Sequence, residues 1–288
     1  MKTLSEKLFS RHKIPLGMNL RNYLIREYNS FESLDLAKDK SGAKRLFSEH
    51  GIITPKTFFE IKSFSDLSKI SLFPDEFVIK PSRGFGGNGI MVLQKNSQGF
   101  LDPSGEVFSE NKIRKHIRKI LDGEFSGHKE EDVAIVEERI FASPKITFKE
   151  SAGLPDIRIF CVNYVPVMAM MRHSTKATRG RANLTVGAIG IGIDVETGRV
   201  THLFSKKEER EFKLSDFDIP ENFRVPHWKQ LIEASIEASK LSQLSISGVD
   251  LIIDRNDRVV LIEINGRPGI EIQNVNKKSL LESMRLLS

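Results

Sequence analysis

Three oxygen-bearing side chains near the C-terminus, Asp250, Glu263 and Asn265, have the chemistry to hold a metal ion. Two apolar runs, 249–253 and 259–264, flank a polar turn, and this pattern predicts an antiparallel hairpin. Side chains alternate between the faces of a strand, so Glu263 and Asn265 share a face, and pairing of position 250 with 263 adds Asp250. Carboxylate and amide oxygens are the ligands that magnesium accepts, together with water and substrate phosphates.

The same spacing is also typical of a hairpin with a polar, solvent-exposed face, because short motifs have a real false-positive rate. The surrounding runs, VDLII and VVLIEI, are instead typical of buried strands. A carboxylate buried between such runs needs a metal or a basic partner. We therefore favour the metal site and expect other parts of the chain to bind phosphate.

A glycine-rich segment follows a predicted buried strand at 77–80 and leads directly into another strand at 90–93. Glycines let backbone N–H groups approach an anion that side chains would block. Because a strand follows, the segment is neither a P-loop nor a dinucleotide-binding turn. A mobile hairpin turn is the alternative, but Lys80 directly before the glycines favours a flap over phosphate. The residues predicted to bind phosphate here are Lys80, Arg83, Gly84, Gly86 and Gly87.

The rest of the chain is predicted to alternate helices and strands, from the spacing of apolar residues and from capping and turn residues. The predicted helices cover 5–12, 19–28, 39–51, 66–70, 112–121, 227–241 and 277–287, with Lys40 in the first turn of the third. The predicted strands cover 77–80, 90–93, 133–136, two runs within 156–173, 189–194 and 200–204, while 205–225 is expected to be a loop. Several strands form antiparallel hairpins, which indicates an α+β fold rather than a doubly wound parallel sheet.

The composition excludes several classes of protein. The chain has 288 residues, of which 39% are hydrophobic and 28% charged, as is ordinary for a soluble globular protein. Cys161 is the only cysteine, so an intrachain disulfide and a cysteine-based metal site are excluded, and we expect a cytoplasmic protein. No apolar run is long enough to cross a bilayer. The formal net charge of +6 favours anionic partners.

A basic helix and one histidine also have chemistry to consider. The segment 112–121 has basic residues between its apolar positions, which fits a solvated face or a nucleic-acid-binding stripe. We favour the solvated face, since no aromatic residues are interleaved for base stacking, and nucleic-acid binding would require a steep salt dependence. His173 lies near the basic loop, where proton transfer is one role to consider. No paired carboxylate or nucleophile is visible in the sequence, so we interpret it as a loop or rim residue.

In order along the chain, these features resemble the ATP-grasp superfamily, and within it the RimK-like α-L-glutamate ligases, over roughly residues 35–272. The segment LGMNLRNYLIREYN is also similar to a glutamate-ligase-like, sugar-transfer-associated ATP-grasp group. The resemblance implies two α+β subdomains that clasp ATP, at 39–136 and 137–288. A short helical segment, 1–38, then stands where such ligases commonly have a separate α/β domain.

The resemblance also implies which residues bind the nucleotide. The lysines of the family's "DK" and "IKP"-like motifs, which bind phosphate and the adenine region, fall on Lys40 and Lys80, and the family's glycine flap falls on the glycines from Gly84 onward. The hinge pattern that holds adenine falls on VEERI, which comprises Glu137, Glu138, Arg139 and Ile140. Glu137 and Glu138 stand where the glutamate ligases tend to have Gln-Glu.

The family's reacting centre falls on two further segments. The "DIR" strand start places Arg158 there, and the "R-x-N-L" pattern places Arg181 and Asn183 there, as catalytic residues. The "GxD…ExN…PG" pattern falls on the metal candidates Asp250, Glu263 and Asn265, implying two magnesium ions, for which manganese can substitute. The basic-loop residue Arg179 and Arg267, a cation where the ligases often have a small residue, are the candidates for binding an acidic substrate.

The activity that the resemblance implies is ATP-dependent formation of an amide from a carboxylate and an amine through an acyl-phosphate. An acidic amino acid such as glutamate, or an acidic peptide, is the expected substrate, and a homo-oligomer or a partner protein could complete the short N-terminus. Three other functions stay open. The fold can transfer phosphate to a hydroxyl, it can serve as a non-catalytic nucleotide-binding scaffold in a cell-surface polysaccharide or peptide-tag pathway, and the basic charge suits nucleic acid.

Overall fold

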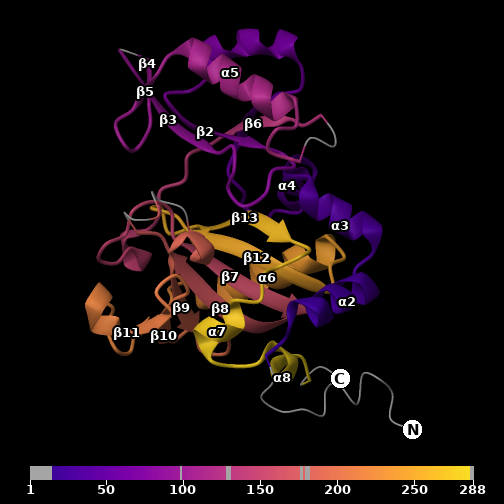
Figure 1. Ribbon diagram of the computed structural model, residues 1–288, viewed down its shortest axis with the longest axis vertical. Helices are drawn as coiled ribbons and strands as arrows, with labels where there is room; N and C mark the ends of the chain where they lie inside the picture. Colours follow the sequence, from indigo (N-terminus) through magenta and orange to yellow (C-terminus); the bar gives the residue numbers. More distant parts are fainter. Residues whose placement is uncertain (1–14, 98, 128–130, 176–177, 179–181, 286–288) are drawn as a thin grey trace. The chain divides into compact units, whose positions relative to one another are not determined.

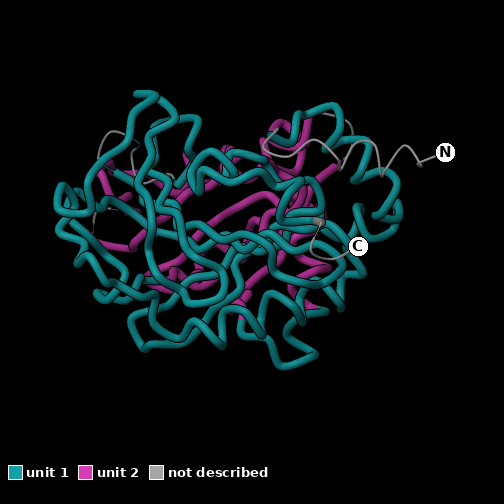
Figure 2. The backbone as a smooth tube through the Cα atoms, turned by 90° about the horizontal axis from the view of Figure 1, so that it is seen from below, with its two compact units in different colours: residues 1–37, 46–53, 141–288 teal, residues 38–45, 54–140 magenta. Residues whose placement is uncertain are grey.

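The chain folds into two units, each built on an antiparallel sheet. The computed structural model describes residues 15–97, 99–127, 131–175, 178 and 182–285. Unit 1 contains residues 1–37, 46–53 and 141–288, and unit 2 contains residues 38–45 and 54–140 (Figure 2). Helices accompany both sheets (Figure 1), and the expected α+β fold class is confirmed.

Unit 2 has a six-stranded sheet in the order β1-β6-β2-β3-β4-β5. Its strands are β1 (Thr57–Ile61), β2 (Glu76–Pro81), β3 (Met91–Asn96), β4 (Gly99–Leu101), β5 (Val107–Phe108) and β6 (Ala134–Glu137). Helix α5 (Glu110–Leu121) and a 3-10 helix (Phe64–Leu72) complete its core. Ile113, Ile117 and Ile120 of α5 are fully buried, because their spacing puts them on one face of the helix. Ser109 caps α5 by accepting from the backbone N of Lys112.

Unit 1 has a seven-stranded sheet in the order β11-β10-β9-β8-β7-β12-β13. Its strands are β7 (Asp156–Val162), β8 (Val165–His173), β9 (Ile189–Ile193), β10 (Val200–Ser205), β11 (Arg210–Phe212), β12 (Ile246–Ile253) and β13 (Val259–Asn265). The helices of this part of the chain are α2 (Met18–Tyr28), α3 (Phe31–Lys38), α6 (Trp228–Leu241), α7 (Ile272–Asn276) and α8 (Leu280–Arg285). Helix α4 (Lys40–Glu49) begins in unit 2 and ends in unit 1.

The strand register places charged residues side by side in the middle of the unit 1 sheet. Asp250 of β12 pairs with Glu263 of β13, so the register predicted for this hairpin is confirmed. On its other side Asp250 pairs with Arg158 of β7, and Asp156 of β7 pairs with Arg172 of β8. Residues opposite each other in neighbouring strands point to the same face, so this register gathers acids and arginines there.

Several local predictions need correction. The segment 205–225 is not all loop, because β11 pairs with β10 and a 3-10 helix follows at Leu214–Phe217. The ring of Phe217 packs edge to face against both Phe212 and His173 of β8, which joins this segment to the rest of unit 1. Helices α3 and α7 and the β4–β5 hairpin were not predicted, and the predicted helix 5–12 lies outside the described residues.

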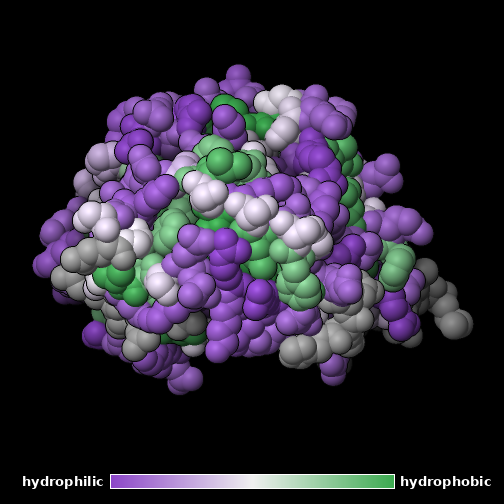
Figure 3. Space-filling model, turned by 90° about the horizontal axis from the view of Figure 1, so that it is seen from above, coloured by the Kyte–Doolittle hydropathy of each residue, from purple (hydrophilic) through white to green (hydrophobic). Residues whose placement is uncertain are grey.

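Hydrophilic residues predominate on the face of the molecule that Figure 3 shows, and its apolar side chains lie in smaller groups among them. Among the described residues, no helix is long and apolar enough to cross a membrane.

Candidate functional site

The centre of the unit 1 sheet holds a buried network of ion pairs. Arg158 donates from Nε to Oδ1 and from Nη2 to Oδ2 of Asp250, both at 2.6 Å. Arg172 donates from Nη2 to Asp250 Oδ2 at 2.8 Å, and from Nε and Nη2 to the two carboxylate oxygens of Asp156 at 2.5 and 2.6 Å. Asp250 and Arg158 are both buried. Two-pronged contacts of this kind fix the orientation of both partners as well as their distance.

The network carries more negative than positive charge. Asp156, Asp250 and Glu263 supply three carboxylates, and Arg158 and Arg172 supply two guanidinium groups, which leaves an excess of one negative charge when all are ionised. Burial opposes the ionisation of Asp250, but Arg158 and Arg172 outweigh it and lower the pKa of Asp250 to about 2. Burial raises the pKa of Asp156 to about 6, since the charge of Asp250 adds to burial and Arg172 only partly opposes them. The arginines therefore do not compensate all three acids.

Asn265 links the two carboxylates of the β12–β13 hairpin. Its Nδ2 lies 3.2 Å from Asp250 Oδ2 and 3.2 Å from Glu263 Oε1. A half-turn of the amide presents Oδ1 to the same place, and this oxygen together with two carboxylates matches the ligands of magnesium. No set of three His, Cys, Asp or Glu side chains within the described ranges is arranged to hold one ion, so the candidate site depends on Asn265. The negative excess and the oxygen donors both fit a divalent cation.

Unit 2 holds a second buried cluster, in which two lysines share one carboxylate. Lys80 Nζ of β2 lies 2.7 Å from Glu137 Oε1 at the end of β6, and Lys44 of α4 is bonded to the other oxygen of Glu137. Burial and the charge of Lys80 lower the pKa of Lys44 to about 8, although Glu137 opposes both. Burial opposes the ionisation of Glu137, but Lys80 and Lys44 outweigh it and lower the pKa of Glu137. This cluster has an excess of one positive charge.

The glycine-rich segment begins beside this cluster. Lys40 Nζ donates to the backbone oxygen of Gly84 at 2.5 Å. The backbone N of Arg83 donates to both oxygens of Asp132, at 3.0 and 3.2 Å, which fixes the start of the segment. Gly86 and Gly87 have φ of +66° and +77°, a region that glycine adopts without strain. The segment therefore turns back on itself with its backbone exposed, as a flap over phosphate requires.

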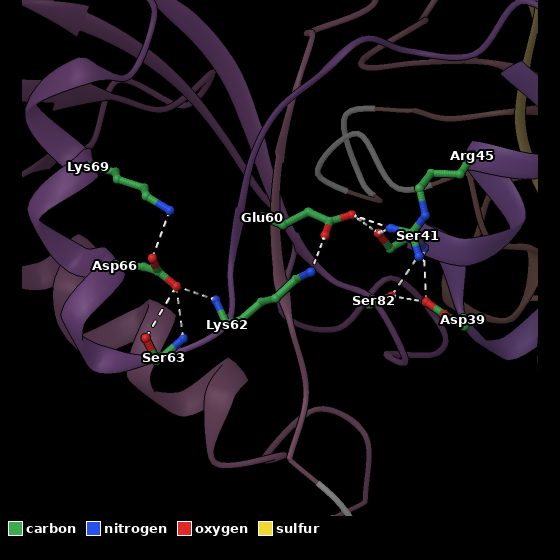
Figure 4. A network of polar contacts seen from close by, with 9 residues as sticks. All are labelled: Asp39, Ser41, Arg45, Glu60, Lys62, Ser63, Asp66, Lys69 and Ser82. Atoms are coloured by element: carbon green, nitrogen blue, oxygen red, sulfur yellow. Dashed lines mark hydrogen bonds and ion pairs between the residues drawn. The ribbon is translucent and has the colours of Figure 1, made fainter. Parts of the chain in front are cut away.

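A polar network holds the start of α4 in place, and Figure 4 shows it from close by. Ser82 Oγ donates to Asp39 Oδ1 at 2.7 Å, and the backbone N of Ser41 donates to Asp39 Oδ1 at 3.2 Å and to Ser82 Oγ at 3.1 Å. Arg45 Nη1 donates to Glu60 of β1 at 2.8 Å. Lys40 and Lys44 lie four residues apart, and so one turn apart, on this helix. Because the network fixes the start of the helix, it positions both lysines.

The remaining predicted residues are less closely grouped. The backbone N of Glu138 donates to the backbone oxygen of Lys56 at 2.8 Å. Arg139 Nη1 lies 3.4 Å from Glu76 Oε1, and the side chain of Ile140 is half-buried. Asn183 accepts from the backbone and side chain of Thr185 at 3.0 and 2.7 Å, and so caps a short 3-10 turn. Arg267 is exposed at the end of β13, and Arg179 and Arg181 lie outside the described residues.

One interpretation from the sequence is wrong, and two residues were missed. His173 is fully buried, and its Nε2 donates to the backbone oxygen of Lys149 at 3.1 Å, so it is not a rim residue. Arg172 was missed, although it lies in the predicted strand one residue before His173 and on the face of Met170 and Arg158. Lys44 was missed too, although the spacing of four from Lys40 puts it one helical turn away on the same face.

Comparison with known proteins identifies the family of this chain. The family model for sugar-transfer associated ATP-grasp proteins matches residues 19–287, so the chain belongs to this family. The prediction of the ATP-grasp superfamily is therefore confirmed. No curated protein matches the sequence significantly.

Solved structures that match this chain have very different sequences. A D-alanine–D-alanine ligase from Bacillus anthracis, solved with ATP, is 13% identical with a TM-score of 0.52, over 89% of this chain and 66% of that one. The ATP-grasp ligase PsnB, solved with a minimal precursor, is 11% identical with a TM-score of 0.48, over 90% of this chain and 63% of that one. This chain spans less than two thirds of the length of either ligase.

Proposed function

We propose that this protein is an ATP-dependent carboxylate–amine ligase with an acidic amino acid or acidic peptide as one substrate. The observation that carries the proposal is the opposite charge of the two buried clusters. The two positive charges of Lys80 and Lys44 outnumber the single negative charge of Glu137, and this positive excess suits the binding of phosphate oxygens. The Asp250 network has the opposite excess, which suits magnesium. An ATP-dependent ligase needs both kinds of site.

Each group of residues has a distinct task in this proposal. Lys40, Lys44 and Lys80 neutralise the phosphates, and the backbone amides of the glycine-rich segment cover them. Asp250, Glu263 and Asn265 would hold magnesium, which would supply positive charge to offset the negative charge that develops on the phosphates. Arg158, fixed by Asp250, donates to the transferred phosphoryl group, and Arg181 and Asn183 serve the reacting centre with it.

The proposed reaction has two steps. An oxygen of the substrate carboxylate bonds to the γ-phosphorus of ATP, the bond from that phosphorus to the bridging oxygen breaks, and ADP leaves with the electron pair. The amine nitrogen of the acceptor then bonds to the acyl carbon, the carbon–oxygen bond to phosphate breaks, and the amine loses a proton. The products are an amide, ADP and phosphate. Positioning of the reactants and neutralisation of charge supply most of the acceleration.

The proposed substrate class depends on two further arginines. Arg267 is exposed directly after the hairpin that carries the candidate metal ligands, and Arg179 precedes Asn183 in the basic stretch of the sequence. Arginine binds carboxylates with two parallel hydrogen bonds, so we assign both residues to a substrate with a free carboxylate. An acidic amino acid such as glutamate, joined to an amine acceptor, is the proposed substrate.

The test is magnesium-dependent release of ADP from ATP in the presence of a panel of amino acids and amines, with mass spectrometry of the products. We expect ADP release to require a particular acidic amino acid, and the acceptor to gain the mass of that amino acid minus one water. Glu263→Gln should abolish both signals, while Glu233→Gln, an exposed glutamate on α6, should leave them unchanged. A product that carries phosphate without an amide would replace the ligase with a phosphotransferase.

A further inference from the structure

The N-terminal helices hold the loop that follows the candidate metal ligands. Arg21 of α2 donates from Nε to the backbone oxygen of Pro268 at 3.1 Å and from Nη2 to the backbone oxygen of Arg267. Its third donor, Nη1, bonds Asn22 Oδ1 at 2.7 Å. Arg21 is buried, and burial together with the charge of Arg267 lowers its pKa. Burying a cation is costly in free energy. Here the guanidinium donates hydrogen bonds to two successive backbone carbonyl groups of one loop.

A second residue grips the start of the same loop. Asn29, directly after α2, donates from Nδ2 to the backbone oxygen of Ile246 at 2.8 Å and to that of Gly266 at 3.3 Å. Its Oδ1 accepts from the backbone N of Ile246 at 2.9 Å. The buried amide therefore ties Gly266 to the first residue of β12.

Close packing leaves this loop little freedom. A Cβ on Gly266 would lie 2.8 Å from Leu34 Cδ2 of α3, and a Cβ on Gly248 of β12 would lie 2.7 Å from Pro268 Cβ. The segment 266–268 thus lies against α3 on one side and β12 on the other. Asn265, the residue immediately before it, makes the hydrogen bonds to both candidate metal-binding carboxylates.

We propose that Arg21 and Asn29 are positioning residues of the metal site. They fix the backbone of 266–268, and through it they fix the side chain of Asn265 and the starting direction of Arg267. A helix needed only for stability can be held by apolar contacts, as Leu24 and Ile25 of α2 already hold it. Hydrogen bonds to three successive carbonyl groups, of Gly266, Arg267 and Pro268, control the orientation of the backbone instead.

The consequence is that the N-terminal segment is part of the active centre, although neither residue touches the metal. Groups that orient metal ligands typically change metal affinity about 10- to 100-fold when they are removed. This inference rests on the proposed function for the identity of the site as a metal site. The grip of Arg21 and Asn29 on the loop can be measured independently.

The experiment titrates Mn²⁺ into the full chain with ADP and follows the electron paramagnetic resonance signal of free Mn²⁺. Arg21→Gln should weaken Mn²⁺ binding about tenfold, and Asn29→Ser should weaken it in the same direction. Arg21→Lys keeps the charge and the stem but has no fork to hold two carbonyl groups, so it should be intermediate. Arg26→Gln removes an exposed arginine from the same helix and should bind Mn²⁺ as the wild type does.

Hydrogen exchange of the peptide covering 262–270, measured without nucleotide or metal, reports how firmly Arg21 and Asn29 hold the backbone of this loop. We expect faster exchange in Arg21→Lys than in Arg26→Gln, with the peptides of unit 2 unchanged. Equal Mn²⁺ affinity in wild type and in a folded Arg21→Lys whose loop exchanges faster would overturn the positioning role. Failure of the wild type to bind Mn²⁺ would instead contradict the proposed metal site, so the two failures are distinguishable.

Discussion

The two buried clusters both place several charged side chains in contact with one another, and they differ in which sign of charge predominates. In unit 2, one carboxylate, Glu137, is shared by two lysines. In unit 1, Arg158 and Arg172 are shared among Asp156, Asp250 and Glu263. Each cluster satisfies most of its charges internally and keeps one in excess. A buried charge of this kind is costly for stability, and we propose that each cluster binds a ligand of opposite sign.

The clusters also differ in stiffness. The arginine network has two-pronged hydrogen bonds between neighbouring strands of a sheet, so few rearrangements are open to it. The lysines instead approach Glu137 from a helix and a strand as single ammonium groups on long stems. We infer that the unit 1 cluster fixes the reacting groups, while the unit 2 cluster adjusts to the nucleotide.

The largest effect should follow from Asp250→Asn. The amide is uncharged and has one acceptor oxygen where the carboxylate has two, and its own N–H group faces a guanidinium. Arg158 therefore loses its charged partner, and Arg172 keeps only Asp156. We expect a loss of about 3–5 kcal/mol in the free energy of unfolding, measured with urea. Asp216→Asn, an acid at the start of a short turn, is the control and should lose much less. Equal stability of Asp250→Asn and wild type would mean that the network does not form.

Lys80→Met should have the next largest effect, on ATP affinity. Removing a buried cation that binds phosphate should weaken binding by about 10- to 100-fold, which corresponds to the ~1.5–3 kcal/mol of a hydrogen bond to a charged group. Isothermal titration calorimetry measures it directly. Lys62→Met, an exposed lysine paired with Glu60, should bind ATP normally. If both variants bind alike, the unit 2 cluster is not the phosphate site.

A smaller effect is expected from pH. Because the pKa of Lys44 is lowered to about 8, Lys44 is charged below pH 8 and loses its proton as the pH rises through 8. ATP affinity should therefore fall a few-fold between pH 7 and 9, and it should return to its original value when the pH is brought back to 7. In Lys44→Met the affinity should be lower at pH 7 and should change less over this range. A wild-type profile as flat as that of the variant would count against Lys44.

The smallest effect should follow from Arg114→Gln on the basic face of α5. Arg114 is paired with Glu110 one turn earlier, with Nη2 2.5 Å from Oε1, at a solvent-exposed position. Such pairs contribute about 0.3–0.5 kcal/mol, so thermal unfolding should change little and ATP affinity not at all. A steep loss of RNA binding in this variant would revive the nucleic-acid alternative for this helix.

The sequence predicted the fold class and the hairpin because apolar runs and turn residues report local structure directly. Asp250 pairs with Glu263 because the register shifts by one residue between Asp250 and Leu251, a local irregularity that the apolar pattern does not reveal. The sequence could not reveal that the Arg172 side chain reaches Asp250. The two residues lie 78 positions apart, on strands β8 and β12, which are not neighbours in the sheet because β7 lies between them. The grip of Arg21 on the loop at 268 is equally non-local, so no motif indicates it.

The measurement that tests the account most directly is ATP binding with and without Mg²⁺, by calorimetry, in wild type, Lys80→Met and Glu263→Gln. We predict that Lys80→Met weakens binding under both conditions. Glu263→Gln should bind ATP alone as wild type does and should lose the additional affinity that Mg²⁺ provides. The same Mg²⁺-dependent gain in Glu263→Gln and in wild type would contradict the assignment of metal binding to the unit 1 cluster and phosphate binding to the unit 2 cluster.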